Sequence, residues 1–268
     1  MYQQKTSSAL YYFKENNISF DCTMFSEFKY GNSYYGELMA KELAVFFEKK
    51  FSILKTKKII VFSSPYDYIK TSSWYLTNHL FFILKNKYNF SIEFDKINRL
   101  NTYPNDYGLM SKEERYQLIS KDTYEFEKKP DEDSFLLFVD DISITGTHQL
   151  IIENLIFQNN YQNDFMFLYY AKLTGDGNPR IESYLNNYKI KNHYDLIELI
   201  SKDCFNYTTR AIKYLLLLDG NEFLDFCKII NQIKPFFLKE IYILSIKNKF
   251  DTINSFSENL NKLKIIIS

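Results

Sequence analysis

The chain has 268 residues, and its 46% hydrophobic content is enough for a packed core and excludes global disorder. Lys and Arg together number 33, as do Asp and Glu, so the zero net charge argues against general binding to nucleic acid or an anionic membrane. No apolar run reaches the roughly 20 residues of a membrane-spanning helix, and residues 1–16 show no secretory signal pattern. The 3 cysteines are widely spaced and fit neither a disulfide framework nor a zinc site, so we expect a cytoplasmic protein without nucleic-acid or membrane partners.

Aromatic residues make up 18% of the chain, with 25 Phe and 23 Tyr. We expect these rings to fill the core in place of Leu and Val. The alternative, stacking on nucleic-acid bases, also needs a basic track along the surface, and the zero net charge argues against one.

The first half of the chain alternates between helical and strand patterns. Apolar residues at helical spacing predict helices over residues 41–53 and 71–87, and short apolar runs predict strands over 58–62 and 90–94. Residues 98–133 are polar and charged instead, which indicates a mobile functional loop. A short helix is expected within it, over residues 111–119.

The second half begins with the clearest buried strand, over residues 134–139, followed by a helix over 147–159 and a strand over 165–172. Alternating strands and helices predict the α/β class, with a mostly parallel sheet flanked by helices. From Tyr194 onward the pattern is helical. We therefore predict an α/β core over residues 1–190 and a helical subdomain over 191–268, which either forms a hood over a site or the surface of a homodimer.

One segment, residues 135–148, carries the chemistry. A buried strand ends in Asp140 and Asp141, and a turn with Thr145, Gly146 and Thr147 leads into a helix. Ligands of open α/β sheets bind outside the carboxyl ends of the strands, and backbone amides at a helix N-terminus suit a phosphate. Because adjacent carboxylates are good acceptors for neutral hydroxyls, the segment fits a ribose 5-phosphate.

Two alternatives exist for the acidic pair. The first is a purely structural strand end that caps the next helix. The second is a magnesium-dependent phosphatase with Asp140 or Asp141 as nucleophile, and it is disfavoured because adjacent side chains on a strand point to opposite faces.

Residues 135–147 resemble the phosphoribosyl pyrophosphate (PRPP) signature of the type I phosphoribosyltransferases: four apolar residues, two acidic residues and a Thr/Ser/Gly turn. The resemblance implies a type I phosphoribosyltransferase-like fold, in which Asp140 and Asp141 are catalytic, bind the ribose hydroxyls and take part in holding Mg²⁺. The implied 5-phosphate loop consists of Ser143, Ile144, Thr145, Gly146 and Thr147.

Two positions depart from the commonest family pattern. Ile144 stands where many purine-salvage members have an Asp, which puts hypoxanthine–guanine salvage in doubt. His148 stands where a Thr or Ser is usual, but the backbone amides that bind phosphate remain.

Further segments are similar to a bacterial branch of the family, the phosphoribosyltransferase-like proteins of tellurium-resistance-type gene clusters. The similarity covers roughly residues 25–175, with a fainter part over 206–217. Its segments are residues 28–31, 35–36, 63–68, 98–99, 106–108 and 140–148.

The resemblance implies further site residues. The loop after the first core strand, with Ser64, Pro65 and Tyr66, would hold the pyrophosphate. The segment 98–133 would be the mobile loop that closes over the site, with Arg99 as a catalytic cation and Arg115 as a second candidate. Each arginine can instead be an ordinary surface residue. Lys29 and Tyr30 are candidates for the acceptor pocket, and Arg210 for a contribution from the helical region.

The resemblance thus implies transfer of ribose 5-phosphate from PRPP to a small-molecule acceptor, most often through a nitrogen atom, with Mg²⁺ and release of pyrophosphate. The alternative from another class is a regulatory protein that binds PRPP or a nucleotide without turnover, because a fold does not fix a function.

Overall fold

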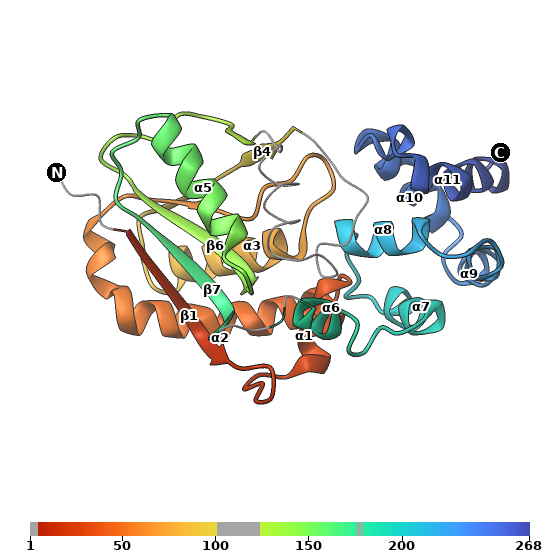
Figure 1. Cartoon of the computed structure of the whole chain (residues 1–268), viewed down its shortest axis with the longest axis horizontal. Coiled ribbons are helices and arrows are strands. Elements are labelled where there is room, and N and C mark those ends of the chain that lie inside the picture. The colour runs from red at the N-terminus through yellow and green to blue at the C-terminus, as the bar shows by residue number, and fades with distance from the viewer. Residues whose placement is uncertain (1–4, 101–123, 176–177, 179) are drawn as a thin grey trace.

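The computed structural model describes residues 5–100, 124–175, 178 and 180–268. At its centre is a five-stranded sheet with the order β1-β7-β6-β2-β3, in which all neighbouring strands are parallel (Figure 1). Its strands are β1 (Lys5–Phe13), β2 (Ile59–Phe62), β3 (Ile92–Asp95), β6 (Phe135–Ser143) and β7 (Phe165–Leu173). The predicted α/β class is confirmed, and the arrowheads of β1, β6 and β7 in Figure 1 point toward the C-terminal helices.

Helices cover both faces of this sheet. On one face, apolar side chains such as Leu43, Leu80 and Leu137 form a cluster with helices from the first third of the chain. These helices are α1 (Cys22–Lys29), α2 (Ser33–Phe51), which a 3₁₀ turn η1 (Ser52–Thr56) extends, and α3 (Ser72–Asn86). The other face packs against α5 (Thr147–Gln158), and α6 (Ile181–Asn186) follows β7.

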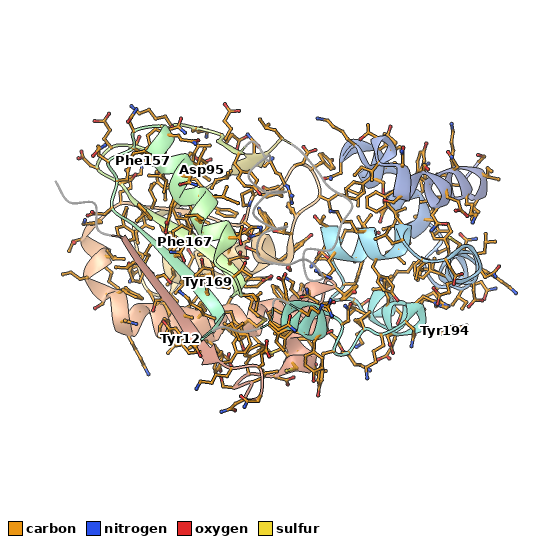
Figure 2. All side chains as sticks on the ribbon, in the orientation of Figure 1. Tyr12, Asp95, Phe157, Phe167, Tyr169 and Tyr194 are labelled. Atoms are coloured by element: carbon orange, nitrogen blue, oxygen red, sulfur yellow. The ribbon has the colours of Figure 1, made fainter. Side chains whose placement is uncertain are left out.

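The face under α5 is rich in aromatic rings, as the composition predicts. Phe138 stacks on Phe62 and on Phe167 with ring centroids 5.3 and 5.0 Å apart. Phe167 and Tyr169 continue the row along β7, where Figure 2 labels both. These rings therefore serve as core filler.

The ends of the segment 98–133 differ from the expectation of an irregular loop. Strands β4 (Ile97–Arg99) and β5 (Tyr124–Phe126) pair antiparallel, and Phe126 packs on Phe62 at a centroid distance of 5.2 Å. These strands are short and contain only a few apolar residues among charged ones, so the sequence pattern is too weak to predict them. The predicted helix over 111–119 and Arg115 lie outside the described residues.

Two N-terminal elements were not predicted. Strand β1 pairs with β7 from a distant part of the chain. Because it lies at one edge of the sheet, its sequence is a mixture of polar and apolar residues. Helix α1 begins at a cap, where the Asp21 carboxylate accepts hydrogen bonds from the amides of Thr23 and Met24.

Residues after 192 are helical, as predicted. They form α7 (His193–Ser201), α8 (Thr209–Leu216), α9 (Gly220–Ile233), α10 (Phe237–Lys247), η3 (Phe250–Thr252) and α11 (Asn254–Ile266). Side chains such as Ile212, Phe226 and Phe256 give this region its own hydrophobic cluster. The domain boundary between residues 190 and 191 stays a prediction. Among the residues with described positions, no helix combines the length and the apolar character needed to cross a bilayer.

The helical region joins the core at the corner between α1 and α2. Gly31, with φ +114°, accepts a backbone hydrogen bond from this region: the Asn206 amide donates to the Gly31 carbonyl at 2.7 Å. A Cβ atom on Gly31 would lie 2.0 Å from the Asn206 carbonyl oxygen, so only glycine fits here. The hydroxyl of Thr208 also donates to the Lys29 carbonyl at 3.1 Å.

Candidate active site

A cavity of about 730 Å³ lies between the carboxyl ends of β2 and β6 and the helical region. One wall, which we call the sheet wall, includes Ser64, Pro65 and the segment 140–149. The opposite wall, the helical wall, includes residues 190–192 and one side of α8. The volume is within the range of small-molecule sites, which run from about 300 to 1,000 Å³.

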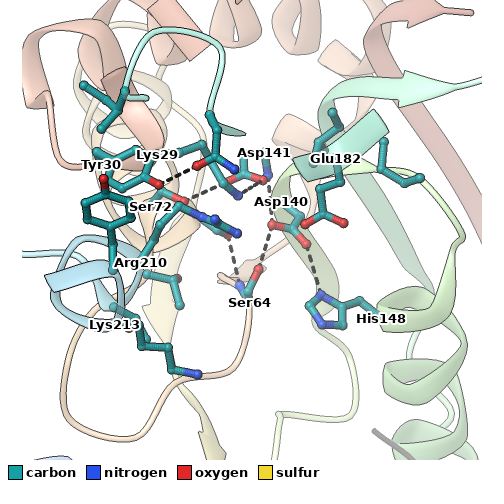
Figure 3. Close-up of a pocket in the computed structure, with 18 of the residues that line it drawn as sticks. Lys29, Tyr30, Ser64, Ser72, Asp140, Asp141, His148, Glu182, Arg210 and Lys213 are labelled. Atoms are coloured by element: carbon teal, nitrogen blue, oxygen red, sulfur yellow. Dashed lines mark hydrogen bonds and ion pairs between the residues drawn. The ribbon is translucent and has the colours of Figure 1, made fainter. Parts of the chain in front are cut away.

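The two aspartates of β6 point to different surroundings. The strand continues to Ser143, beyond the predicted end at 139, so Asp140 and Asp141 lie on a regular strand and face opposite sides. Asp141 is buried: its two carboxylate oxygens lie 2.9 and 2.8 Å from Lys29 Nζ, and Oδ2 accepts from the Ser72 hydroxyl at 2.7 Å (Figure 3).

Asp140 lies on the other side of the strand, closer to the cavity. Its Oδ1 accepts hydrogen bonds from the Ser64 hydroxyl at 2.7 Å and from the Asp141 amide at 2.9 Å. Its Oδ2 faces His148, with Nδ1 at 3.6 Å. Because this contact is longer than both bonds to Oδ1, Oδ2 is the oxygen better placed to accept from a ligand in the cavity.

The two surroundings shift the two pKa values in opposite directions. For Asp140, burial opposes ionisation, but His148, Lys29 and the Ser64 hydroxyl outweigh it and hold the pKa below its ordinary value. For Asp141, burial and the neighbouring Asp140 charge raise the pKa, against the lowering by Lys29 and Ser72. Asp140 is thus the carboxylate that stays ionised most readily.

The turn after β6 leads directly into α5. Gly146 is the N-cap of this helix, with φ +71° and ψ +7°, a left-handed conformation that favours glycine. A Cβ atom here would meet nothing within 4 Å. The glycine is therefore required by the backbone angle, and not by a lack of space. The hydroxyls of Thr145 and Thr147 lie 2.8 Å apart beside it. Hydroxyls and the first amides of a helix thus face the cavity at one point.

A family model described as PRTase ComF-like, where PRTase stands for phosphoribosyltransferase, matches residues 4–263. The chain belongs to the PRTase ComF-like family. This membership confirms the resemblance to the phosphoribosyltransferases and supports phosphoribosyl transfer as the general class of reaction. The narrower resemblance to the proteins of tellurium-resistance-type gene clusters stays a prediction.

Two crystal structures of a hypoxanthine phosphoribosyltransferase from Staphylococcus aureus, in orthorhombic and tetragonal space groups, are similar to part of this PRTase ComF-like chain. They share 12% and 14% identity with it, at TM-scores of 0.33 and 0.31. Each covers 55% of this chain, and this chain covers 78% and 76% of theirs. Among curated proteins, none matches the chain.

Most residues that the sequence predicts for the site lie together in this PRTase ComF-like chain. The predicted residues that line the cavity are Ser64, Pro65, Arg99, Asp140, Asp141, Ser143, Ile144, Thr145, Gly146 and Thr147. Tyr66 is not among the lining residues. Its ring lies 4.5 Å from Lys96 Nζ and its carbonyl accepts from the Arg99 amide at 3.2 Å, so Tyr66 contacts both ends of β4. Lys29, Tyr30 and Arg210, the weaker candidates, also line the cavity.

Sequence reasoning missed two contributors. Thr71 caps α3, and Ser72, the first residue of this helix, donates to Asp141. Lys213 had no motif around it, although it follows Arg210 by three positions and therefore shares its helix face. That spacing is the signal that could have found it.

The residues of the cavity fit Mg²⁺ only where the substrate supplies further ligands to the ion. Within the described part of the chain, no group of three or more His, Cys, Asp or Glu side chains could hold a metal ion. Mg²⁺ commonly uses one or two carboxylates together with substrate phosphates and water. Asp140 Oδ2 fits that need, whereas the Asp141 oxygens already bond Lys29 and Ser72. The metal role that the resemblance implies for Asp141 is therefore the weaker of the two.

Proposed function

We propose that the chain transfers the 5-phosphoribosyl group of PRPP to a nitrogen atom of a small-molecule acceptor and releases pyrophosphate. The observation that carries this proposal is that Asp140 and the turn formed by Thr145, Gly146 and Thr147 line the same cavity. A carboxylate can accept hydrogen bonds from the ribose hydroxyls, and a helix N-terminus can bind the phosphate. Together the two groups suit a ribose 5-phosphate. Membership of the PRTase ComF-like family supports the same reading.

The two aspartates divide the work in this proposal. Asp140 accepts a hydrogen bond from a ribose hydroxyl through Oδ2, because its Oδ1 is taken by Ser64 and a backbone amide. Asp141 is a positioning residue: its ion pair with Lys29 fixes the end of α1 against β6. The 5-phosphate binds the amides and hydroxyls at the start of α5.

In the reaction, the bond between C1 of the ribose and the pyrophosphate oxygen breaks, and its electron pair leaves with pyrophosphate. C1 becomes electron-poor, and the nearby Asp140 carboxylate stabilises this positive charge. The acceptor nitrogen then forms the new bond to C1 and gives up its proton to the released pyrophosphate. Asp140 would help to hold Mg²⁺ together with PRPP, and the ion would supply positive charge beside the diphosphate. The chain's own residues contribute by orienting the ribose relative to the acceptor.

The acceptor side of the proposal has one constraint. Ile144 lines the cavity beside the phosphate turn and offers no polar group to a base. We therefore propose an acceptor other than hypoxanthine or guanine.

The test is calorimetric titration of PRPP in the presence of Mg²⁺. We expect binding by the wild-type chain and a loss of binding in Asp140→Asn, with Asp141→Asn weakened through the lost Lys29 pair. A thermal-shift version should show about 2.7 kcal/mol of stabilisation at 100 times the dissociation constant. Asp131→Asn is the matched control, because that carboxylate is 65% exposed and pairs with Lys58 on the surface.

The outcomes separate enzyme from regulator. Pyrophosphate release with any nitrogen acceptor supports the transferase. Tight PRPP binding without release across a broad acceptor panel indicates the regulatory alternative. If the folded wild-type chain binds neither PRPP nor ribose 5-phosphate, the proposal is wrong.

A further inference from the structure

Helix α8 presents two different faces. Ala211, Ile212, Leu215 and Leu216 are buried in the hydrophobic cluster of the helical region. The opposite face turns toward the cavity, where it contributes Arg210, Lys213 and Tyr214, with Leu217 just after the helix end. The outer face of α8 is therefore part of a ligand site.

The start of α8 is fixed to the loop between β2 and α3, residues 63–71. The Thr209 amide donates to the Lys70 carbonyl at 3.0 Å, and the Thr209 hydroxyl donates to the Ile69 carbonyl at 2.9 Å. This is the same loop that brings Ser64 and Pro65 to the cavity. Arg210 follows Thr209 directly, so its distance from the loop is set by these bonds.

A second contact holds the same loop from α10. The side-chain oxygen of the buried Asn248 accepts from the amides of Tyr68 and Ile69, at 3.0 and 2.6 Å. The Lys247 ammonium donates to the Tyr68 hydroxyl at 2.9 Å. The loop thus has a defined position relative to the helical wall, although the two are far apart in the sequence.

The charges in the cavity are arranged unevenly. The sheet wall offers a carboxylate to hydroxyls and one turn to a single phosphate, and Lys29 is already paired with Asp141. The helical wall adds the cations Lys191, Arg210 and Lys213. Figure 3 shows the Arg210 side chain extending from α8 toward Ser64.

Among the described residues, four acids line the cavity: Asp140 bonds Ser64, and Asp141 pairs with Lys29. Glu182 lies on the other side of Asp140 in Figure 3, and Glu222 faces His193 at 4.0 Å. Because its cations lie on the helical wall, the side of the cavity nearest α8 is the part that suits a multiply charged anion. Arginine forms paired hydrogen bonds with phosphate oxygens, and lysine adds a compact positive charge.

We propose that Arg210 and Lys213 bind the diphosphate group of PRPP from the helical wall and stabilise the negative charge that it gains when the C1–O bond breaks. The electron pair of that bond moves onto the departing pyrophosphate, facing these two cations. This inference rests on the proposed function, and it gives the helical region a direct part in the chemistry.

The experiment compares three ligands by calorimetry with Mg²⁺ present: PRPP, inorganic pyrophosphate and ribose 5-phosphate. In Arg210→Gln and Lys213→Met we expect PRPP and pyrophosphate to bind roughly 10- to 100-fold more weakly, as for loss of a charged hydrogen-bond partner. Ribose 5-phosphate should bind as it does to the wild type. Arg210→Lys keeps the charge without the fork and should fall in between.

Lys228→Met is the matched control, because it removes a lysine charge from the exposed side of α9, away from the cavity. Unfolding curves show whether each variant is folded. If Arg210→Gln does not fold, Lys213→Met tests the inference, because the Lys213 side chain is half-exposed. The inference is overturned if the variants bind pyrophosphate like the wild type, or if all three ligands weaken equally. Wild-type binding of ribose 5-phosphate without pyrophosphate overturns it while leaving the 5-phosphate site intact; binding of none of the three overturns both proposals.

Discussion

The sheet wall and the helical wall of the cavity are built in different ways. The sheet wall gathers most of its groups within one short segment, residues 140–149. The helical wall depends on contacts between distant residues, such as Asn248 with the amide of Tyr68, 180 positions earlier. Site residues that lie within one short segment can be recognised from the sequence. Site residues that are brought together by long-range contacts cannot. Three variants test how strongly each wall depends on its supports.

The largest expected effect is on the sheet wall. Lys29→Met leaves the Asp141 charge buried without its cation, and breaking such a pair costs about 3–5 kcal/mol of unfolding free energy. Urea unfolding at pH 7 measures this loss. The loss should shrink at low pH, because the raised pKa of Asp141 lets the carboxylate protonate and removes the unpaired charge.

An exposed ion pair provides the control. Lys57 and Asp164 lie 2.9 Å apart, about as close as Lys29 and Asp141, but their side chains are 45% and 33% exposed instead of 11% and 3%. Lys57→Met should therefore cost at most about 1 kcal/mol. Adding Asp141→Asn to Lys29→Met should recover part of the stability. Equal losses in the two single variants would show that burial does not set the strength of the sheet wall.

The next effect is on the helical wall. Asn248→Ala leaves the amides of Tyr68 and Ile69 without their acceptor, at a cost of about 1–3 kcal/mol. The released loop should also weaken pyrophosphate binding, which calorimetry measures. Asn259→Ala is the control: it is equally buried and donates to the carbonyls of Leu216 and Leu218, away from this loop. Similar stability losses with unchanged binding in both variants would contradict a role for Asn248 in placing the loop.

The smallest effect is expected at the turn formed by Thr145, Gly146 and Thr147, which we propose binds the 5-phosphate. Gly146→Ala places a Cβ in a left-handed conformation at a cost of about 1–2 kcal/mol, and it should weaken ribose 5-phosphate binding measured by calorimetry. Gly175 has φ +84° with nothing within 4 Å of its ideal Cβ, and it does not line the cavity. Gly175→Ala should thus lose similar stability and keep its binding. If Gly146→Ala binds ribose 5-phosphate normally, the turn is not the phosphate site.

The sequence predicted those parts of the molecule that short-range patterns determine. The strand before Asp140 and the helix after Gly146 were placed within a few residues, because burial imposes a continuous apolar run or a helical period on them. The partners of Asp141 were not found, since Lys29 and Ser72 lie 112 and 69 positions away and no spacing rule links them. Strand β1 was missed because an edge strand needs no continuous apolar run.

The edge position of β1 also has a consequence for biosynthesis. The paired residues of β1 lie 160 positions before their partners in β7, from Lys5 with Phe165 to Phe13 with Leu173. A ribosome adding about 5–20 residues per second needs roughly 10–30 s to cover that distance. During this interval the first strand has no partner in the sheet. The nascent chain therefore closes its sheet late, after every other strand of the sheet has been made.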